Sequence, residues 1–204
     1  MTEQVVPDSV VRPAPAATDA TTDSLPGFVR EARPGDLDAI GRVHAATMLA
    51  SLQAGHEGPL PDGVRAMIAA PVLTTGWESA VLTPPSPAHH VLVATQGQEV
   101  VGLAAVAPAS EDSVDPRAEG SRTVDLIALG VHPDHQRAGH GSRLLAACAD
   151  LARGDGAQAL IAWTVRGDDS LARLMTTSGL APTGGHRRLP VGSGVTEVCW
   201  AAAL

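Results

Sequence analysis

The chain has 204 residues, of which 44% are hydrophobic and 18% are charged, and its formal net charge is -8 at pH 7. This length and composition predict one globular domain. The negative charge argues against nucleic acid as the main partner, because duplex binding needs a basic surface. Two cysteines, Cys148 and Cys199, are too few for a disulfide framework or a zinc site. No apolar run approaches the roughly 18 residues of a membrane span, and the first residues lack the basic region of a signal peptide, so we expect a cytoplasmic protein.

The first part of the chain differs in character from the rest. Residues 1–26 are rich in Pro, Ala, Thr and Asp and show no periodicity, which predicts a disordered tail. The domain is expected over residues 27–204 and opens with a strand near Phe28–Ala32. A helix capped by Asp36 follows, and then a shorter helix over Asp62–Ala70.

The remaining elements alternate between strands and helices. In chain order we expect a hairpin (His90–Ala94 and Glu99–Val106), a strand (Thr123–Val131), a helix (Gly139–Arg153), a buried strand (Ala159–Val165), a helix capped by Asp168 or Asp169 and closed by Gly179, and a final strand (Val195–Trp200). An early hairpin followed by alternating helices and strands indicates an α/β (α+β) domain with one mixed sheet and helices on its faces.

The most informative stretch is a strand that ends at Val131-His132-Pro133, followed by the loop Gln136-Arg137-Ala138-Gly139-His140-Gly141 and then a helix. Glycines let a backbone bend tightly and approach a ligand without a Cβ in the way. The start of a helix presents free N–H groups and the positive end of its dipole, which suits a diphosphate. The loop is not a P-loop, since no Gly-Lys-Ser/Thr follows, and it has too few glycines for a dinucleotide fingerprint.

This stretch resembles the signature of the GCN5-related N-acetyltransferase (GNAT) superfamily, in which a strand ending V-x-P is followed, after two residues, by Q/R-x-x-G-x-G/A and a helix. The similarity continues over Asp168–Leu180, which corresponds to the family pattern N-x-x-A-x-x-L-Y-x-x-x-G-F. It covers roughly residues 28–204 and is specific between 123 and 153. It implies a single GNAT-like domain with a mixed, mostly antiparallel sheet. It also implies an N-acetyltransferase that takes acetyl-CoA as co-substrate, uses no metal and acetylates an amine of a small molecule or peptide.

The resemblance also implies which residues hold the co-substrate. The pyrophosphate would lie on backbone amides of the loop and first helical turn: Gln136, Arg137, Ala138, Gly139, His140, Gly141 and Ser142. Leu129 and Val131 would meet the pantetheine arm through their main chain, beside a bulge for which Gly130 is the expected residue. Asp168 stands where relatives carry an asparagine that helps to bind pantetheine.

Two further positions bear on catalysis. Asp125 lies where many family members carry a glutamate, so we nominate it as the general base, acting through a water; the alternative is a strand-edge carboxylate paired with an arginine. Met175 occupies the position where relatives often place a tyrosine that protonates the departing thiolate. The chain contains no tyrosine, so water is the expected acid.

Several other features fit more than one interpretation. His132, His135 and His140 cluster around the loop, but metal binding is disfavoured there, and we expect His140 and Arg137 to face solvent or the adenosine end. An acidic loop beside the expected acceptor entrance carries Glu111, Asp112, Asp115 and Glu119. The three tryptophans, Trp77, Trp163 and Trp200, are assigned to packing. The early helices could form a homodimer surface.

Two other functions stay open at this point. The chain could be an acyl-CoA-binding domain with little catalysis, used in sensing or assembly, because the tyrosine is missing and Asp replaces Glu. It could also be an acyltransferase that uses a different acyl-CoA.

Overall fold

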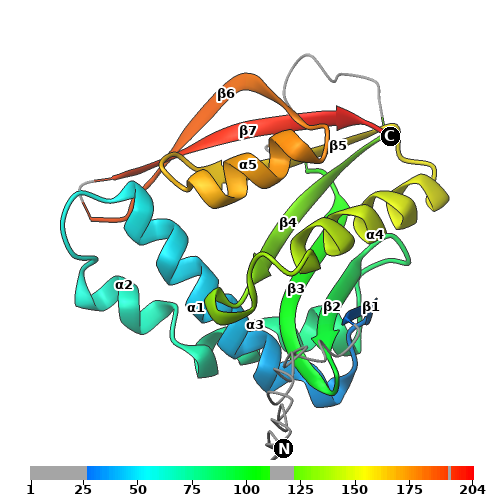
Figure 1. The fold of residues 1–204 in the computed structure, drawn as a ribbon, viewed down its shortest axis with the longest axis horizontal. Helices are drawn as coiled ribbons and strands as arrows, with labels where there is room; N and C mark the ends of the chain where they lie inside the picture. The colour runs from blue at the N-terminus through cyan, green and yellow to red at the C-terminus, as the bar shows by residue number, and fades with distance from the viewer. Residues whose placement is uncertain (1–26, 111–121, 193) are drawn as a thin grey trace, which may run out of the picture.

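The computed structural model describes residues 27–110, 122–192 and 194–204 (Figure 1). The predicted tail, residues 1–26, and the acidic loop with Glu111, Asp112, Asp115 and Glu119 lie outside the described residues.

A seven-stranded mixed sheet forms the centre of the domain, in the order β1-β2-β3-β4-β5-β7-β6. The strands are β1 (Gly27–Glu31), β2 (His90–Gln96), β3 (Glu99–Pro108), β4 (Thr123–Val131), β5 (Ala159–Val165), β6 (Ala181–Leu189) and β7 (Val195–Ala203). All neighbouring strands are antiparallel except β4 and β5, which are parallel. The predicted fold class, a mixed and mostly antiparallel sheet flanked by helices, is therefore confirmed.

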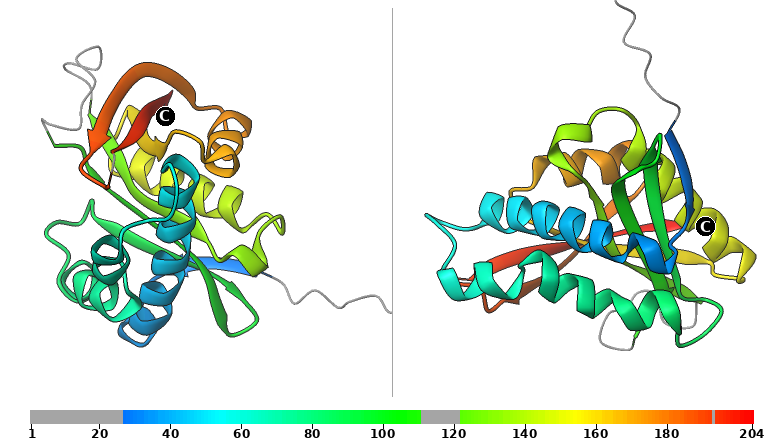
Figure 2. Two further views of the ribbon diagram at one scale, coloured as in Figure 1. Left: turned by 90° about the vertical axis from the view of Figure 1, so that its left-hand side faces the viewer. Right: turned by 90° about the horizontal axis from the view of Figure 1, so that it is seen from below.

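Helices cover both faces of this sheet (Figures 1 and 2). The α-helices are α1 (Leu37–Gly55), α2 (Asp62–Met67), α3 (Ala70–Leu82), α4 (His140–Gly154) and α5 (Asp169–Thr177), and short 3-10 turns lie at Pro34–Asp36 and Pro133–His135. Ile40 and Val43 of α1 and Trp77 of α3 pack on one face, with Val93 and Leu103 of the sheet. We call this the α1 face.

The opposite face, which we call the α4 face, holds the larger apolar cluster. Leu144 and Cys148 of α4 and Met175 of α5 pack there against Leu160 of β5 and Trp200 of β7. Both cysteines are buried thiols that form no disulfide. Burial of the Cys148 thiol raises its pKa to about 12, which suits a packing residue rather than a nucleophile.

Two elements were not predicted from the sequence. The helix expected to end at Ala70 ends at Met67, and α3 begins at Ala70, with Pro71 in its first turn, where the missing N–H of proline costs nothing. The edge strand β6 carries Gly184-Gly185 and lacks apolar alternation. It pairs only with β7, with a register shift between Pro182 and His186, as proline and glycine allow at a sheet edge.

Candidate functional site

The site begins where two neighbouring strands separate. β4 and β5 pair only from Thr123↔Ala159 to Leu126↔Ala162, although β4 continues to Val131 and β5 to Val165. Beyond this point a cleft of about 670 Å³ opens, lined by the second half of β4, the end of β5, the C-terminal half of α1, the loop before α4, and α5. The cleft therefore passes between the two halves of the sheet.

The main chain of β4 is directed into this cleft at alternate residues. His132 N–H donates to Val101 O at 2.8 Å, which makes these two residues a hydrogen-bonded pair. In an antiparallel ladder the next residue along is a non-bonded one. Val131 and Leu129, opposite Gly102 and Ala104, thus turn their N–H and C=O groups away from β3, towards the cleft.

β4 contains a bulge, but not at the expected residue. Ala105 pairs with Ala128 and Val106 with Leu126, so Ile127 is the extra residue. The prediction that Gly130 forms the bulge is wrong. Gly130 serves a different purpose, because a Cβ at this position would lie 2.6 Å from Thr47 Oγ1 on α1. Because Gly130 has no Cβ, α1 can approach β4 at the wall of the cleft.

The loop before α4 forms a concave row of backbone N–H groups. Gly139 is the N-cap of α4 and has φ 78°, and Arg137 has φ 66°. Within the part of the chain that the structure describes, no oxygen accepts from the N–H groups of residues 137–142, and Arg143 N–H is the first to bond, to Gly139 O. Such amides at a helix N-terminus favour an anionic ligand.

The side chains around this loop mostly hold it in shape. Gln136 Nε2 donates to Val131 O at 3.2 Å, and Arg143 Nη2 donates to Ala138 O at 3.1 Å. His140 is only 3% exposed, so the expectation that it faces solvent is wrong. Burial, and then the charge of Arg143 and the neighbouring His135, lower the pKa of His140, whose Nδ1 lies 3.2 Å from Arg143 Nη2.

Asp168 lies at the start of α5, and Met175 lies within this helix. Asp168 is the N-cap of α5; its Oδ1 accepts from Leu171 N–H at 3.0 Å, and the residue lines the cleft. Met175 is 1% exposed and packs in the core of the α4 face, so no proton donor stands at that position.

All the predicted loop residues except Ala138 line the cleft, together with Leu129 and Val131.

Asp125 lies apart from these groups. It is half-buried, pairs with Ile161 across the parallel ladder, and is not among the residues that line the cleft. Its neighbours Val124 and Leu126 pack on the α4 face. By the alternation of a strand, Asp125 therefore faces the α1 face, before the bulge. Its role as a base stays a prediction.

The packing assignment is right for two tryptophans, and the third lies at the cleft. Trp77 and Trp200 are buried, and their Nε1 groups donate to His44 Nδ1 at 3.0 Å and Thr164 Oγ1 at 2.8 Å. Trp163, by contrast, lines the cleft. Its Nε1 is buried and has no hydrogen-bond partner, the one such side-chain atom among the described residues.

Three residues were missed from the sequence: His44 and Glu197, which line the cleft, and Arg187, which contacts Trp163 and Glu197. Arg187 Nε donates to Glu197 Oε2 at 2.6 Å, and its guanidinium carbon lies 4.4 Å from the centroid of the Trp163 ring. Burial lowers the pKa of His44, whose Nδ1 accepts from Trp77. The only signal in the sequence was that His44 shares one face of its helix with apolar residues. Arg187 and Glu197 meet across a strand pair that was not predicted.

Two properties of the described residues complete the picture. Within them, no helix is long and apolar enough to cross a membrane. Nor do three or more His, Cys, Asp or Glu side chains gather there in a way that could hold a metal ion.

Comparison with known proteins identifies the kind of domain. The model of the acetyltransferase (GNAT) family matches residues 66–178. No curated protein sequence matches the chain. Solved structures with this fold include YncA of Salmonella typhimurium with its cofactor acetyl-CoA, at 20% identity and TM-score 0.59 over 87% of this chain and 94% of that one. PaiA N-acetyltransferase of Thermoplasma acidophilum, in complex with coenzyme A, gives 10% identity and TM-score 0.64 over 88% and 100%. The ribosomal-protein-alanine N-acetyltransferase of Brucella melitensis gives 19% and 0.60 over 87% and 99%. At these identities the likeness shows the fold.

Proposed function

The chain belongs to the acetyltransferase (GNAT) family, and from this premise we propose that it transfers the acetyl group of acetyl-CoA to an amine of a small molecule or peptide. The observation that carries the proposal is the row of unbonded N–H groups of residues 137–142 at the start of α4, beside the cleft between β4 and β5. Two structures with the same fold hold acetyl-CoA or coenzyme A.

The cradle suits the pyrophosphate of this co-substrate. Charge-assisted hydrogen bonds contribute roughly 1.5–3 kcal/mol each, and the dipole of α4 adds up to about 2 kcal/mol in a partly buried setting. Several amides between Gln136 and Ser142 can thus anchor the nucleotide end without a metal. The outward N–H and C=O groups of Leu129 match the amides of the pantetheine arm, and Asp168 lies at the same wall.

Acetyl-CoA supplies a thioester carbonyl, and the amine nitrogen forms the new C–N bond as the C–S bond breaks. The amine must lose a proton. For an amine of pKa ~10.4, deprotonation near pH 7 costs about 4–5 kcal/mol, so a base is useful. We assign this role to Asp125, through a water. The thiol has a pKa near 8.5, so release as thiolate costs only about 2 kcal/mol, and solvent can return the proton.

A second function, an acyl-CoA-binding domain with little catalysis, is favoured by one observation. Relatives often carry a proton-donating tyrosine where this chain has Met175, and Met175 lies in the core. This alternative predicts the same cofactor binding with no transfer.

Turnover separates the two functions. The purified protein is incubated with acetyl-CoA and a panel of amines while released thiol is measured and products are weighed by mass spectrometry. Acetylated product supports the transferase. Binding of acetyl-CoA by calorimetry, together with no acetylation of any amine, contradicts it and supports the sensor. Running the same panel with propionyl- and succinyl-CoA determines the acyl preference.

A further inference from the structure

We propose that Trp163 and Glu197 recognise the acetyl acceptor, and that this acceptor is an amine with a carbonyl or carboxylate oxygen on the adjacent carbon, such as an amino-acid derivative or a peptide N-terminus. The proposal deepens the proposed function and rests on it. It starts from the buried, unsatisfied indole N–H of Trp163, a residue that lines the cleft.

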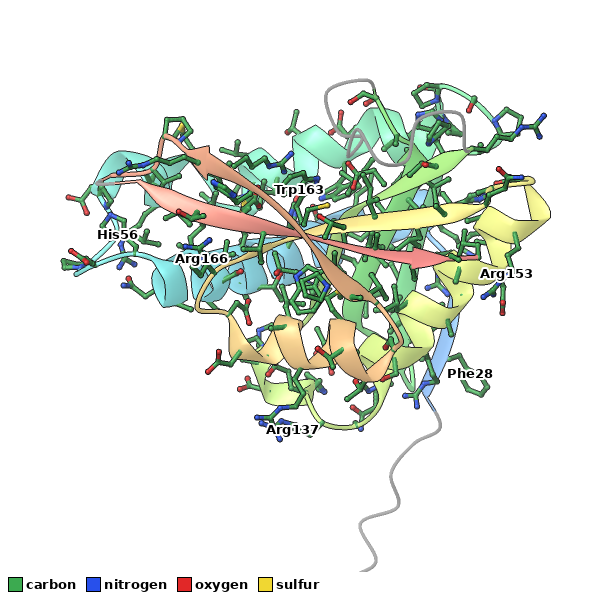
Figure 3. The ribbon with its side chains drawn as sticks, turned by 90° about the horizontal axis from the view of Figure 1, so that it is seen from above. Phe28, His56, Arg137, Arg153, Trp163 and Arg166 are labelled. Atoms are coloured by element: carbon green, nitrogen blue, oxygen red, sulfur yellow. The ribbon has the colours of Figure 1, made fainter. Side chains whose placement is uncertain are left out.

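Trp163 projects from the side of the sheet that the loop of residues 136–142 does not occupy. Leu160 and Ala162 of β5 pack on the α4 face. Strand alternation then turns Trp163 and Val165 to the α1 face, where Val165 and Leu52 of α1 belong to a separate apolar cluster. Figure 3 agrees, since Trp163 and Arg137 lie on opposite sides of the strands. A ligand held by the α4 amides leaves the α1 face to the second substrate.

Glu197 shares that face with Trp163. Trp163 pairs with Cys199, and Val165 with Glu197, across β5 and β7. Trp163 and Glu197 are therefore diagonal neighbours, with Cα atoms roughly 7–8 Å apart, which one small ligand can bridge. Asp125 faces the same way from β4, although it does not line the cleft.

Only one of the two carboxylate oxygens of Glu197 has a hydrogen-bond donor among the described residues. Arg187 Nε donates to Oε2 at 2.6 Å, and no other donor to this carboxylate is found there. The side chain is only 14% exposed. Oε1 thus remains as an acceptor in a partly desolvated setting, where a charge-assisted bond to an ammonium group is strong.

The Trp163 N–H, by contrast, is a donor that lacks an acceptor. A buried donor without an acceptor is costly, and such groups in native structures call for an explanation. Arg187 stacks on the indole face of Trp163. Because the Arg187 side chain is 45% exposed, it can move when a ligand arrives. The missing partner is an acceptor atom, such as a carbonyl oxygen, because no described group accepts from this N–H. A compound that brings a cationic nitrogen to Glu197 and a nearby oxygen to Trp163 satisfies both residues.

The experiment compares two amines of similar size in the acetylation assay: alaninamide, which carries the carbonyl, and sec-butylamine, which does not. Alanyl peptides with a free N-terminus extend the first arm. Trp163→Phe keeps an aromatic ring under Arg187 but removes the N–H. We expect it to raise KM for alaninamide roughly tenfold, as loss of one hydrogen bond predicts, and to leave KM for sec-butylamine and for acetyl-CoA near the wild-type values.

The carboxylate is tested in the same way. Glu197→Gln keeps the shape of the side chain, and we expect a higher KM for both amines with a smaller change in kcat. The variant-to-wild-type ratio is taken within each amine, so differences in basicity cancel. Circular dichroism and an unchanged KM for acetyl-CoA control for misfolding.

The outcomes are distinguishable. Equal effects of Trp163→Phe on the two amines, or acetylation of sec-butylamine but of no α-amine with a carbonyl, would overturn the inference and leave the acetyltransferase assignment intact. A protein that binds acetyl-CoA and acetylates neither kind of amine contradicts the proposed function, and the inference falls with it.

Discussion

Gly130 on β4 and Thr47 on α1 lie so close that a Cβ on the glycine would come within 2.6 Å of the threonine Oγ1 and 2.8 Å of its Cγ2. Thr47 cannot turn away without loss, because its hydroxyl donates to the carbonyls of Val43 at 3.0 Å and His44 at 3.1 Å. Both residues line the cleft. This contact sets the distance between α1 and β4, and with it the width of the cleft.

The first prediction concerns this contact. Gly130→Ala should destabilise the protein by about 1–3 kcal/mol, the usual cost of an overpacked site, because α1 must shift away from β4. Urea unfolding measures the loss. Gly63→Ala is the matched control, since a Cβ at residue 63 meets nothing within 4 Å, and alanine suits a helix better than glycine. Equal stabilities of the two variants would show that α1 adapts freely.

A second prediction concerns the turn into α4. Gly139 has φ 78°, a conformation that costs a residue with a Cβ roughly 1–2 kcal/mol. Gly139→Ala should therefore distort the row of N–H groups and weaken acetyl-CoA binding about tenfold, measured by calorimetry. Gly154→Ala, at the other end of the same helix, lies in open space and should bind acetyl-CoA like the wild type. Unchanged affinity of Gly139→Ala would mean that the amides do not carry the pyrophosphate.

The third prediction concerns pH. Burial lowers the pKa of His44, and burial together with Arg143 lowers that of His140, from the ordinary value of 6.5. Below pH 6.5 the unfolded chain therefore binds protons that the folded protein does not, so the free energy of unfolding falls as the pH drops through this range. Above it, these two histidines contribute no slope.

The measurement is urea unfolding at pH 8 and pH 5.5 in the wild type and in His44→Gln. Removing the acceptor of the Trp77 N–H costs the variant some stability at both pH values. The informative quantity is the difference between the two pH values, which should be smaller in His44→Gln. An identical difference in both proteins would mean that His44 takes up a proton in the folded state.

Local patterns predicted the loop before α4, and long-range pairing hid the group around Trp163. The cradle depends on consecutive residues, Gln136 to Ser142, so its glycines, its capping position and the following amphipathic helix all appear in one stretch. Strand β4 was also predicted with its observed bounds. The bulge at Ile127 was not, because the pairing of β3 with β4 decides which residue is extra.

The group around Trp163 illustrates the other limit. Arg187 lies on β6, whose sequence has no apolar alternation, and it reaches Glu197 only because β6 pairs with β7. Neither residue stands out in its own segment, and a tryptophan in an apolar strand favours a packing role. Arg187 and Trp163, whose side chains stack, lie 24 positions apart in the sequence.

The last prediction tests Asp125 as the base. Asp125→Asn preserves the volume of the side chain and removes its basicity, so kcat should fall roughly a hundredfold, within the range for lost general acid–base catalysis, while the Kd for acetyl-CoA stays unchanged. The acid limb of the pH–rate profile should disappear with it, because that limb reports the protonation of the base. Asp150→Asn provides the matched control, since Asp150 is 76% exposed and pairs only with Arg153 on the surface of α4 among the described residues. If Asp125→Asn keeps the full rate, Asp125 is a structural carboxylate of β4, and Glu197, which lines the cleft, is the next acidic residue to test.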